Sequence, residues 1–125
     1  TIEQVETTHK EIQQEFIKEN APIERFYYCP FHKEAKIEKY RAEHPWRKPA
    51  PGMILQAAQD YDIDLSASYL IGDHMTDIQA GINAGCKTIL VLTGKGKQYR
   101  PVLEENNITP SFVTENILTA VDLLI

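Results

Sequence analysis

Apolar side chains at the start of the chain follow a helical pattern. They recur at spacings of three and four residues, as they would along one face of a helix. These positions are Ile2, Val5, His9, Ile12 and Phe16. Thr1 is suited to the N-cap of this helix, and Asn20, which precedes Ala21-Pro22, marks its end. The pattern therefore predicts an amphipathic helix that begins at the first residue of the sequence.

The remainder of the chain alternates short apolar runs with helical patterns. The apolar runs predict strands over residues 25–29, 68–72, 87–94 and 111–113. The helical patterns predict helices over residues 51–61, 75–84 and 99–106, and a further helix that carries Ile117, Val121 and Leu124. Gly85 is a suitable C-cap for the middle helix. Because strands that alternate with helices pair in parallel, the sequence predicts an α/β fold.

Size and composition restrict the class of protein further. The 125 residues suit one domain, and the net charge of −5 argues against a surface that binds nucleic acid. No apolar run approaches the ~18–20 residues that span a bilayer, so a membrane partner is not expected. The chain has two cysteines, which do not make a disulfide framework and favour a cytoplasmic location.

The run YLIGDHMTD places two carboxylates directly after a predicted strand. Asp73 follows the apolar run, and Asp77 lies four residues later, where the next helix begins. In parallel α/β sheets, ligands bind beyond the carboxyl ends of the strands. One interpretation is that either carboxylate caps the helix. The other is that one of them binds a hard cation such as Mg²⁺, which prefers oxygen ligands.

A pair of adjacent cations precedes the helix predicted over residues 51–61. Arg47 and Lys48 lie among Pro45, Pro49 and Pro51, which stiffen the backbone. Such a pair suits phosphate, because arginine offers a bidentate fork and lysine a point charge. The alternative is a solvated surface pair. Together with a metal ligand at a strand end, the pair indicates a phosphoryl-transfer site.

Three segments, taken together and in order, carry a resemblance to a known family. They are YYCP, RKPAPGM and YLIGDHMTDIQAGINAGCKTILVLTGKG. The chain resembles the haloacid dehalogenase superfamily of aspartate-dependent phosphatases. Within it, the chain is most similar to the branch that holds D-glycero-D-manno-heptose 1,7-bisphosphate phosphatase and histidinol-phosphatase. The implied fold is a Rossmann-like parallel sheet with flanking helices.

The resemblance implies roles for five residues. Lys48 matches the lysine that stabilises the transferring phosphoryl group, and Arg47 matches the arginine that recognises substrate. Asp73 matches the aspartate that binds Mg²⁺, and Asp77 matches a second acid that steadies the metal site or caps the helix. His74 falls at a position that contacts substrate and is often lysine.

The implied function is Mg²⁺-dependent hydrolysis of a phosphorylated sugar, most closely D-glycero-D-manno-heptose 1,7-bisphosphate. The alternatives are a histidinol-phosphatase and a non-catalytic remnant that binds phosphate. Histidinol-phosphatase shares the motifs, whereas a remnant would keep the phosphate pocket without the chemistry.

The family's nucleophile, an Asp-x-Asp motif on its first strand, has no counterpart ahead of Lys48. We therefore expect the chain to be the carboxy-terminal portion of a single phosphatase domain without a separate cap domain, lacking the first strands of the sheet. An aspartyl-phosphate would form on an aspartate outside this segment, and the segment alone is expected to be inactive. A missing N-terminal segment, or another chain, would complete the sheet.

The resemblance also implies a structural zinc, which members of the branch hold through one Cys-x-His pair and one Cys-x-Cys pair. The corresponding positions here are Cys29, Phe31, His44 and Trp46, with His32 nearby. Structural zinc takes four nitrogen or sulfur ligands, and phenylalanine and tryptophan offer none. We therefore expect hydrophobic packing to hold this segment in place of zinc; the alternative is zinc bound through Cys29, His32 and His44.

Overall fold

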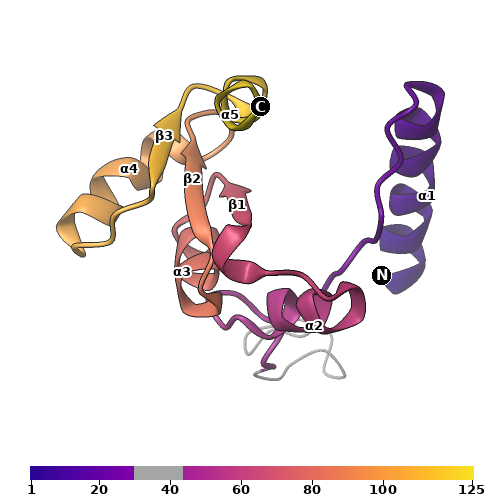
Figure 1. The fold of residues 1–125 in the computed structure, drawn as a ribbon, viewed down its shortest axis with the longest axis horizontal. Coiled ribbons are helices and arrows are strands. Elements are labelled where there is room, and N and C mark those ends of the chain that lie inside the picture. Colours follow the sequence, from indigo (N-terminus) through magenta and orange to yellow (C-terminus); the bar gives the residue numbers. More distant parts are fainter. Residues whose placement is uncertain (30–43) are drawn as a thin grey trace. The chain divides into compact units, whose positions relative to one another are not determined.

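The computed structural model describes residues 1–29 and 44–125 of the chain. The backbone divides into two compact units, Thr1–Glu43 and His44–Ile125. The first unit contains one helix in its described part, and the second contains a parallel sheet with its helices (Figure 1). The predicted α/β fold is confirmed in the second unit.

The first unit is built around α1 (Ile2–Lys18). Its amino-terminal turn is closed by a reciprocal capping box, in which the backbone N–H of Gln4 donates to Thr1 Oγ1 over 3.1 Å. The amino group of Thr1 in turn donates to Gln4 Oε1 over 2.7 Å. Asn20 adopts a left-handed conformation, with φ 57°, just beyond the end of the helix. The predicted helix, its cap and its end are thus confirmed.

The predicted strand over residues 25–29 is wrong, because these residues form no strand. Strand formation requires a neighbouring backbone, and the described part of this unit contains no other strand. The aromatic side chains contact α1 instead. The ring of Phe26 stacks on that of His9 at 4.4 Å between centroids, and the Tyr28 hydroxyl donates to Glu6 over 3.0 Å. The aromatic residues of this segment indicated a strand, but aromatic side chains serve equally well to pack a segment without regular structure onto a helix.

The second unit holds a three-stranded parallel sheet in the order β1-β2-β3. The strands are β1 (Tyr69–Gly72), β2 (Lys87–Val91) and β3 (Phe112–Thr114). The helices are α2 (Gly52–Tyr61), α3 (Met75–Ala84), α4 (Gly96–Glu105) and α5 (Ile117–Leu124), with a short 3-10 helix η2 (Leu65–Ala67) before β1. The predicted elements of this unit are confirmed, although α4 begins earlier than expected and η2 was not predicted.

The core of the second unit lies on both faces of β2. Successive side chains of a strand point to opposite faces. Leu90 accordingly packs with Ile78 of α3 and Leu103 of α4, while Ile89 and Val91 pack with Ala120 of α5. Figure 1 shows these helices on the two sides of the sheet. A strand covered on both faces must be apolar throughout, which explains the uninterrupted apolar run in the sequence.

Two glycines lie at helix termini beside the sheet, one at the end of α3 and one at the start of α4. Gly85 ends α3 in the left-handed conformation, with φ 87°, as the sequence predicted. Gly96 opens α4, and a Cβ at this position would lie 1.7 Å from the carbonyl oxygen of Val91. Only glycine therefore lets α4 begin so close to the end of β2. The sequence analysis predicted a later start because residues 94–97, the Gly-Lys-Gly-Lys run, carry no apolar periodicity.

A helix must be both long and apolar to cross a lipid bilayer. None of the helices within residues 1–29 and 44–125 meets both conditions.

The two glycines predict different costs of substitution. Gly85→Ala should lower the free energy of unfolding by about 1 kcal/mol, because it strains φ without a steric clash. Gly96→Ala should cost about 3 kcal/mol or more, because the backbone of β2 or α4 must move. Urea denaturation of the two variants provides the comparison, and equal losses of stability would contradict it.

Candidate active site

The candidate site lies where β1 and β2 end. Asp73 directly follows β1, and the β2–α4 connection follows the neighbouring strand. The two segments meet through Asp73, whose Oδ2 accepts a hydrogen bond from the backbone N–H of Lys95 over 2.9 Å. Because parallel strands end at the same edge of the sheet, Asp73 lies in the position where α/β proteins bind ligands.

Gly94 makes this approach of Asp73 possible. Its φ of 60° is left-handed, and a Cβ there would lie 2.3 Å from Asp73 Oδ2. Any other residue would therefore clash with the carboxylate as well as strain the backbone. It is the backbone of the Gly-Lys-Gly-Lys run that holds Asp73.

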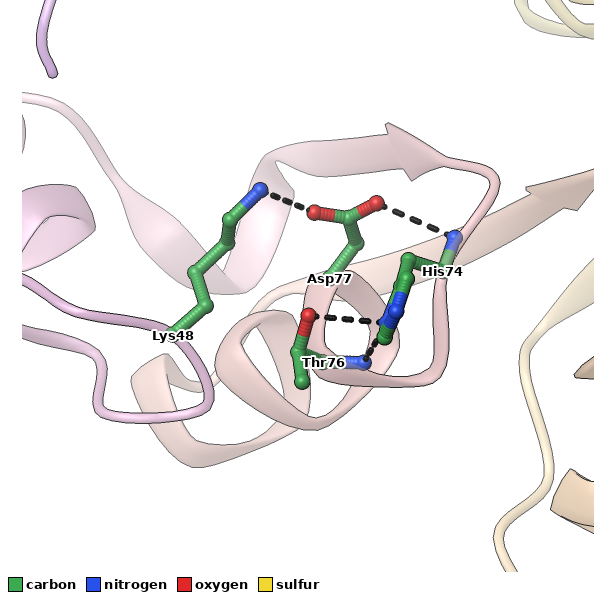
Figure 2. Close-up of polar contacts among 4 residues, drawn as sticks. All are labelled: Lys48, His74, Thr76 and Asp77. Atoms are coloured by element: carbon green, nitrogen blue, oxygen red, sulfur yellow. Dashed lines mark hydrogen bonds and ion pairs between the residues drawn. The ribbon is translucent and has the colours of Figure 1, made fainter. Parts of the chain in front are cut away.

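His74 is the N-cap of α3, so neither nearby aspartate takes that position. The His74 Nδ1 accepts a hydrogen bond from the backbone N–H of Thr76 over 3.1 Å. In return, Oδ2 of Asp77 accepts from the backbone N–H of His74, also over 3.1 Å (Figure 2). This reciprocal capping box satisfies two donors at the helix start, where a carboxylate also meets a favourable dipole.

The second oxygen of Asp77 pairs with Lys48. Figure 2 shows Lys48 extending toward α3, where its Nζ donates to Oδ1 of Asp77. The Asp77 residue is only 8% exposed, whereas the Lys48 side chain is 40% exposed. The carboxylate thus has both oxygens bound within the protein, while the ammonium remains accessible from solvent.

The loop that carries Lys48 is closed and bound to α3. The backbone N–H of Gly52 donates to the carbonyl of Pro45 over 2.8 Å, and a Cβ at Gly52 would lie 2.2 Å from that oxygen. The side chain of Asn83 donates to the carbonyl of Pro49 over 3.1 Å. The loop is therefore held to α3 through both the Lys48 side chain and the Pro49 backbone.

The structure separates the two adjacent cations. Lys48 contacts Asp77, whereas Arg47 is exposed and its guanidinium has no hydrogen-bond or ion-pair partner within residues 1–29 and 44–125. Its backbone closes a turn, donating to the carbonyl of His44 over 2.9 Å. The structure thus groups Lys48, His74 and Asp77, with Asp73 next to His74. Arg47 neighbours Lys48 in the chain, but within residues 1–29 and 44–125 its side chain shares no hydrogen bond or ion pair with any of them.

Several contacts at the site could not be found from sequence motifs. The ring of Tyr99 on α4 lies 4.0 Å from the ring of His74, tilted by 41°. Asn83 and Thr76 also hold site segments, through the hydrogen bonds given above. Of these three residues, only Thr76 lies close to a motif residue in the sequence, two positions after His74.

The acidic run at the end of α2 is structural. Asp62 follows α2 in the left-handed conformation, with φ 51°. Asp64 caps η2, and the hydrogen bond from the Ser66 hydroxyl lowers the pKa of its carboxyl. This run therefore terminates one helix and starts the next.

The structure describes the ligand predicted for Mg²⁺, but not all of the residues predicted for zinc. Asp73 has Oδ2 bound to Lys95, while Oδ1 has no hydrogen-bond partner in the described part of the chain. A carboxylate oxygen of this kind suits Mg²⁺, which prefers oxygen ligands. For zinc, His32 and Phe31 lie outside the described residues, so the expectation about that metal stays a prediction. Residues 1–29 and 44–125 contain no group of three or more potential ligands.

Comparison with known proteins identifies the family. A model of the HAD-hydrolase-like family matches residues 45–120, which include every element of the second unit except part of α5. This chain belongs to the HAD-hydrolase-like family. The resemblance to haloacid dehalogenase-type phosphatases is thereby confirmed.

Curated relatives of the chain are named as heptose bisphosphate phosphatases. The chain is 52% identical over 77 residues, 62% of its length, to D-glycero-alpha-D-manno-heptose-1,7-bisphosphate 7-phosphatase of Burkholderia mallei, spanning 41% of that protein. It is 33% identical over 98% of its length to the D-glycero-D-manno-heptose-1,7-bisphosphate 7-phosphatase of Thermosynechococcus vestitus, spanning 64% of it. It is 38% identical over 76% of its length to the D-glycero-beta-D-manno-heptose enzyme of Escherichia coli, spanning 50% of it.

A solved structure extends this similarity to the fold. The crystal structure of D,D-heptose 1,7-bisphosphate phosphatase from B. bronchiseptica, complexed with magnesium and phosphate, matches 96% of this chain with a TM-score of 0.79 and 26% identity. The chain spans 62% of that protein. The predicted Rossmann-like fold and the similarity to the heptose phosphatase branch are confirmed.

The contact between Lys48 and Asp77 predicts energetic coupling. In a double-mutant cycle of Lys48→Met and Asp77→Asn, we expect a coupling free energy of about 1 kcal/mol, the upper range for a partly exposed ion pair. Chemical denaturation of the four proteins gives this value. The matched control is a second cycle that uses Lys97→Met in place of Lys48→Met. Lys97 is exposed, and its substitution should show no coupling to Asp77. Equal coupling in both cycles would disprove a specific pair.

Proposed function

We propose that this chain is part of a Mg²⁺-dependent phosphomonoester hydrolase that acts on D-glycero-D-manno-heptose 1,7-bisphosphate. The observation that carries the proposal is the ion pair of Lys48 with Asp77, near the strand end where Asp73 has one oxygen without a hydrogen-bond partner among residues 1–29 and 44–125. The names of the relatives support the choice of substrate. The relatives' names differ in the anomer of the sugar. The proposal therefore names the heptose bisphosphate without specifying its anomer, which the assay below determines.

Asp73 would hold the metal. Its carboxylate is oriented by Lys95 N–H, and its other oxygen, which has no hydrogen-bond partner in the described part of the chain, provides the kind of ligand that Mg²⁺ uses alongside water and phosphate. When bound, the metal would neutralise negative charge on the phosphoryl oxygens. Asp77, with both oxygens engaged, would support the site rather than bind metal.

Lys48 would bind the phosphoryl group that is transferred. Its ammonium is anchored by one carboxylate and remains partly exposed, so it can donate further hydrogen bonds to phosphate oxygens. A fixed cation of this kind stabilises the charge that develops during phosphoryl transfer. Arg47, exposed next to it, would recognise the second anionic group of the bisphosphate through its guanidinium fork.

The nucleophile of the proposed reaction would be an aspartate outside these 125 residues, on which an aspartyl-phosphate would form. The relatives are longer than this chain, which spans from 41% to 64% of them. Within the described residues, β1 pairs on one edge only, although all four of its residues are half-buried. We propose that a further strand, from additional sequence or another chain, pairs with this edge and completes a single phosphatase domain without a separate cap.

The proposal predicts which side chains turnover requires. In the native-length protein, phosphate release from D-glycero-D-manno-heptose 1,7-bisphosphate should require Mg²⁺. Asp73→Asn and Lys48→Met should each lower kcat/KM by about 100-fold or more, because each removes charge stabilisation of the transition state. Phosphate release, measured for both anomers and for histidinol phosphate, gives the substrate preference.

Matched substitutions elsewhere control for lost charge and stability. Asp62→Asn places asparagine in a left-handed position that it tolerates, and Lys97→Met removes an exposed cation. Both should keep wild-type turnover. Phosphate binding without turnover in the wild-type protein would point to a non-catalytic phosphate-binding protein, and preferential hydrolysis of histidinol phosphate would contradict the proposed substrate.

The assignment of the nucleophile predicts the behaviour of the 125-residue chain by itself. This chain should release no phosphate from the heptose bisphosphate at any Mg²⁺ concentration, because the aspartate that forms the covalent intermediate is not in it. Mg²⁺-dependent turnover by the isolated chain would show that the nucleophile lies within these residues.

A further inference from the structure

The β2–α4 connection and the start of α4 together contact two consecutive residues of the candidate site. The backbone N–H of Lys95 donates to Asp73 Oδ2 over 2.9 Å, and the ring of Tyr99 lies 4.0 Å from the ring of His74. The backbone N–H of Tyr99 donates to the Lys95 carbonyl over 3.1 Å, so the two contacts are one helical turn apart. A single turn of α4 thus fixes both the proposed metal ligand and the neighbouring histidine.

The His74 ring is also fixed through one of its nitrogens. Its Nδ1 accepts the backbone N–H of Thr76 over 3.1 Å and lies 3.0 Å from the Thr76 hydroxyl. Because Nδ1 accepts a backbone N–H, the neutral tautomer that fits this contact carries its proton on Nε2. Within residues 1–29 and 44–125, Nε2 has no hydrogen-bond partner, so it remains available as a donor.

The Tyr99 ring restricts the remaining freedom of this imidazole. A hydrogen bond to Nδ1 alone does not stop the imidazole ring from tilting. With a small residue at position 99, the ring would lose the packing contact that limits this tilt. The two ring centroids are only 4.0 Å apart, so the rings are in van der Waals contact and Tyr99 limits the movement of the imidazole. The neighbouring strand end thus supplies, through α4, the side chain that sets the direction of the Nε2–H.

We propose that Tyr99 is a positioning residue, which holds His74 so that its Nε2–H donates to an oxygen of the bound sugar phosphate. This inference rests on the proposed function and adds a residue to it. Tyr99 acts through His74 and not on the substrate. The aromatic ring, rather than the phenolic hydroxyl, performs this role.

The kinetic test separates this role from general stabilisation. In the native-length protein, Tyr99→Ala should raise KM for the heptose bisphosphate about 3- to 10-fold, the effect of losing one neutral hydrogen bond, with kcat and the Mg²⁺ requirement unchanged. Tyr99→Phe keeps the ring and should retain the wild-type KM. Gln98→Ala, an exposed neighbour on the same helix, should do the same.

A second substitution tests whether Tyr99 acts through the histidine. His74→Asn keeps an N-cap acceptor for α3 but removes the imidazole. In the His74→Asn background, Tyr99→Ala should cause no further rise in KM. An equal rise in both backgrounds would overturn the inference while leaving the proposed function intact.

A spectroscopic measurement tests the ring contact without any turnover. The NMR signals of the His74 ring, identified by their loss in His74→Asn, should shift when Tyr99→Ala removes the aromatic ring current, and should stay nearly unchanged in Tyr99→Phe. Unchanged signals in Tyr99→Ala would overturn the positioning role. Failure of the wild-type protein to hydrolyse any sugar phosphate would instead refute the proposed function, and with it the donation to substrate.

Discussion

The ion pair between Lys48 and Asp77 connects the parts of the candidate site. Asp77 is nearly buried, and a buried carboxylate without partners would be strongly unfavourable. One of its oxygens binds the backbone at the start of α3, and the other binds the lysine of the proline-rich loop. Gly72 provides the space, since a Cβ there would lie 2.4 Å from the Cβ of Asp77. The helix start and the docking of the loop therefore depend on the same carboxylate.

The two aspartates after β1 have different environments, and this difference supports their different proposed roles. Each oxygen of Asp77 accepts a hydrogen bond from a protein donor, whereas Asp73 keeps an oxygen without a hydrogen-bond partner among the described residues. The β2–α4 connection orients Asp73 through a backbone N–H, and Gly94 permits that approach. In the proposed enzyme, a rigid support of this kind would hold Asp73 in place before metal binding, which would limit the reorganisation required during reaction.

Short sequence patterns predicted most helices and strands of the second unit, because residues close in the sequence determine where these elements begin and end. The apolar run of β2 and the left-handed Gly85 are examples. The strand expected over residues 25–29 was wrong, since strand pairing depends on a distant partner that aromatic content does not reveal. The partner of Lys48 and the contact of Tyr99 with His74 likewise depend on how α2, α3 and α4 pack, and no spacing in the sequence encodes them. The sequence therefore indicated which residue types gather at the candidate site, but not which of them pair.

The most direct measurement is the location of a divalent cation and phosphate in crystals of the native-length protein. Mn²⁺ can replace Mg²⁺ and is visible by its anomalous scattering. We expect an anomalous peak at the carboxylate of Asp73 and phosphate in hydrogen-bond contact with Nζ of Lys48. A cation bound elsewhere, or phosphate bound away from Lys48, would contradict the assignment of this strand edge as the site of phosphoryl transfer.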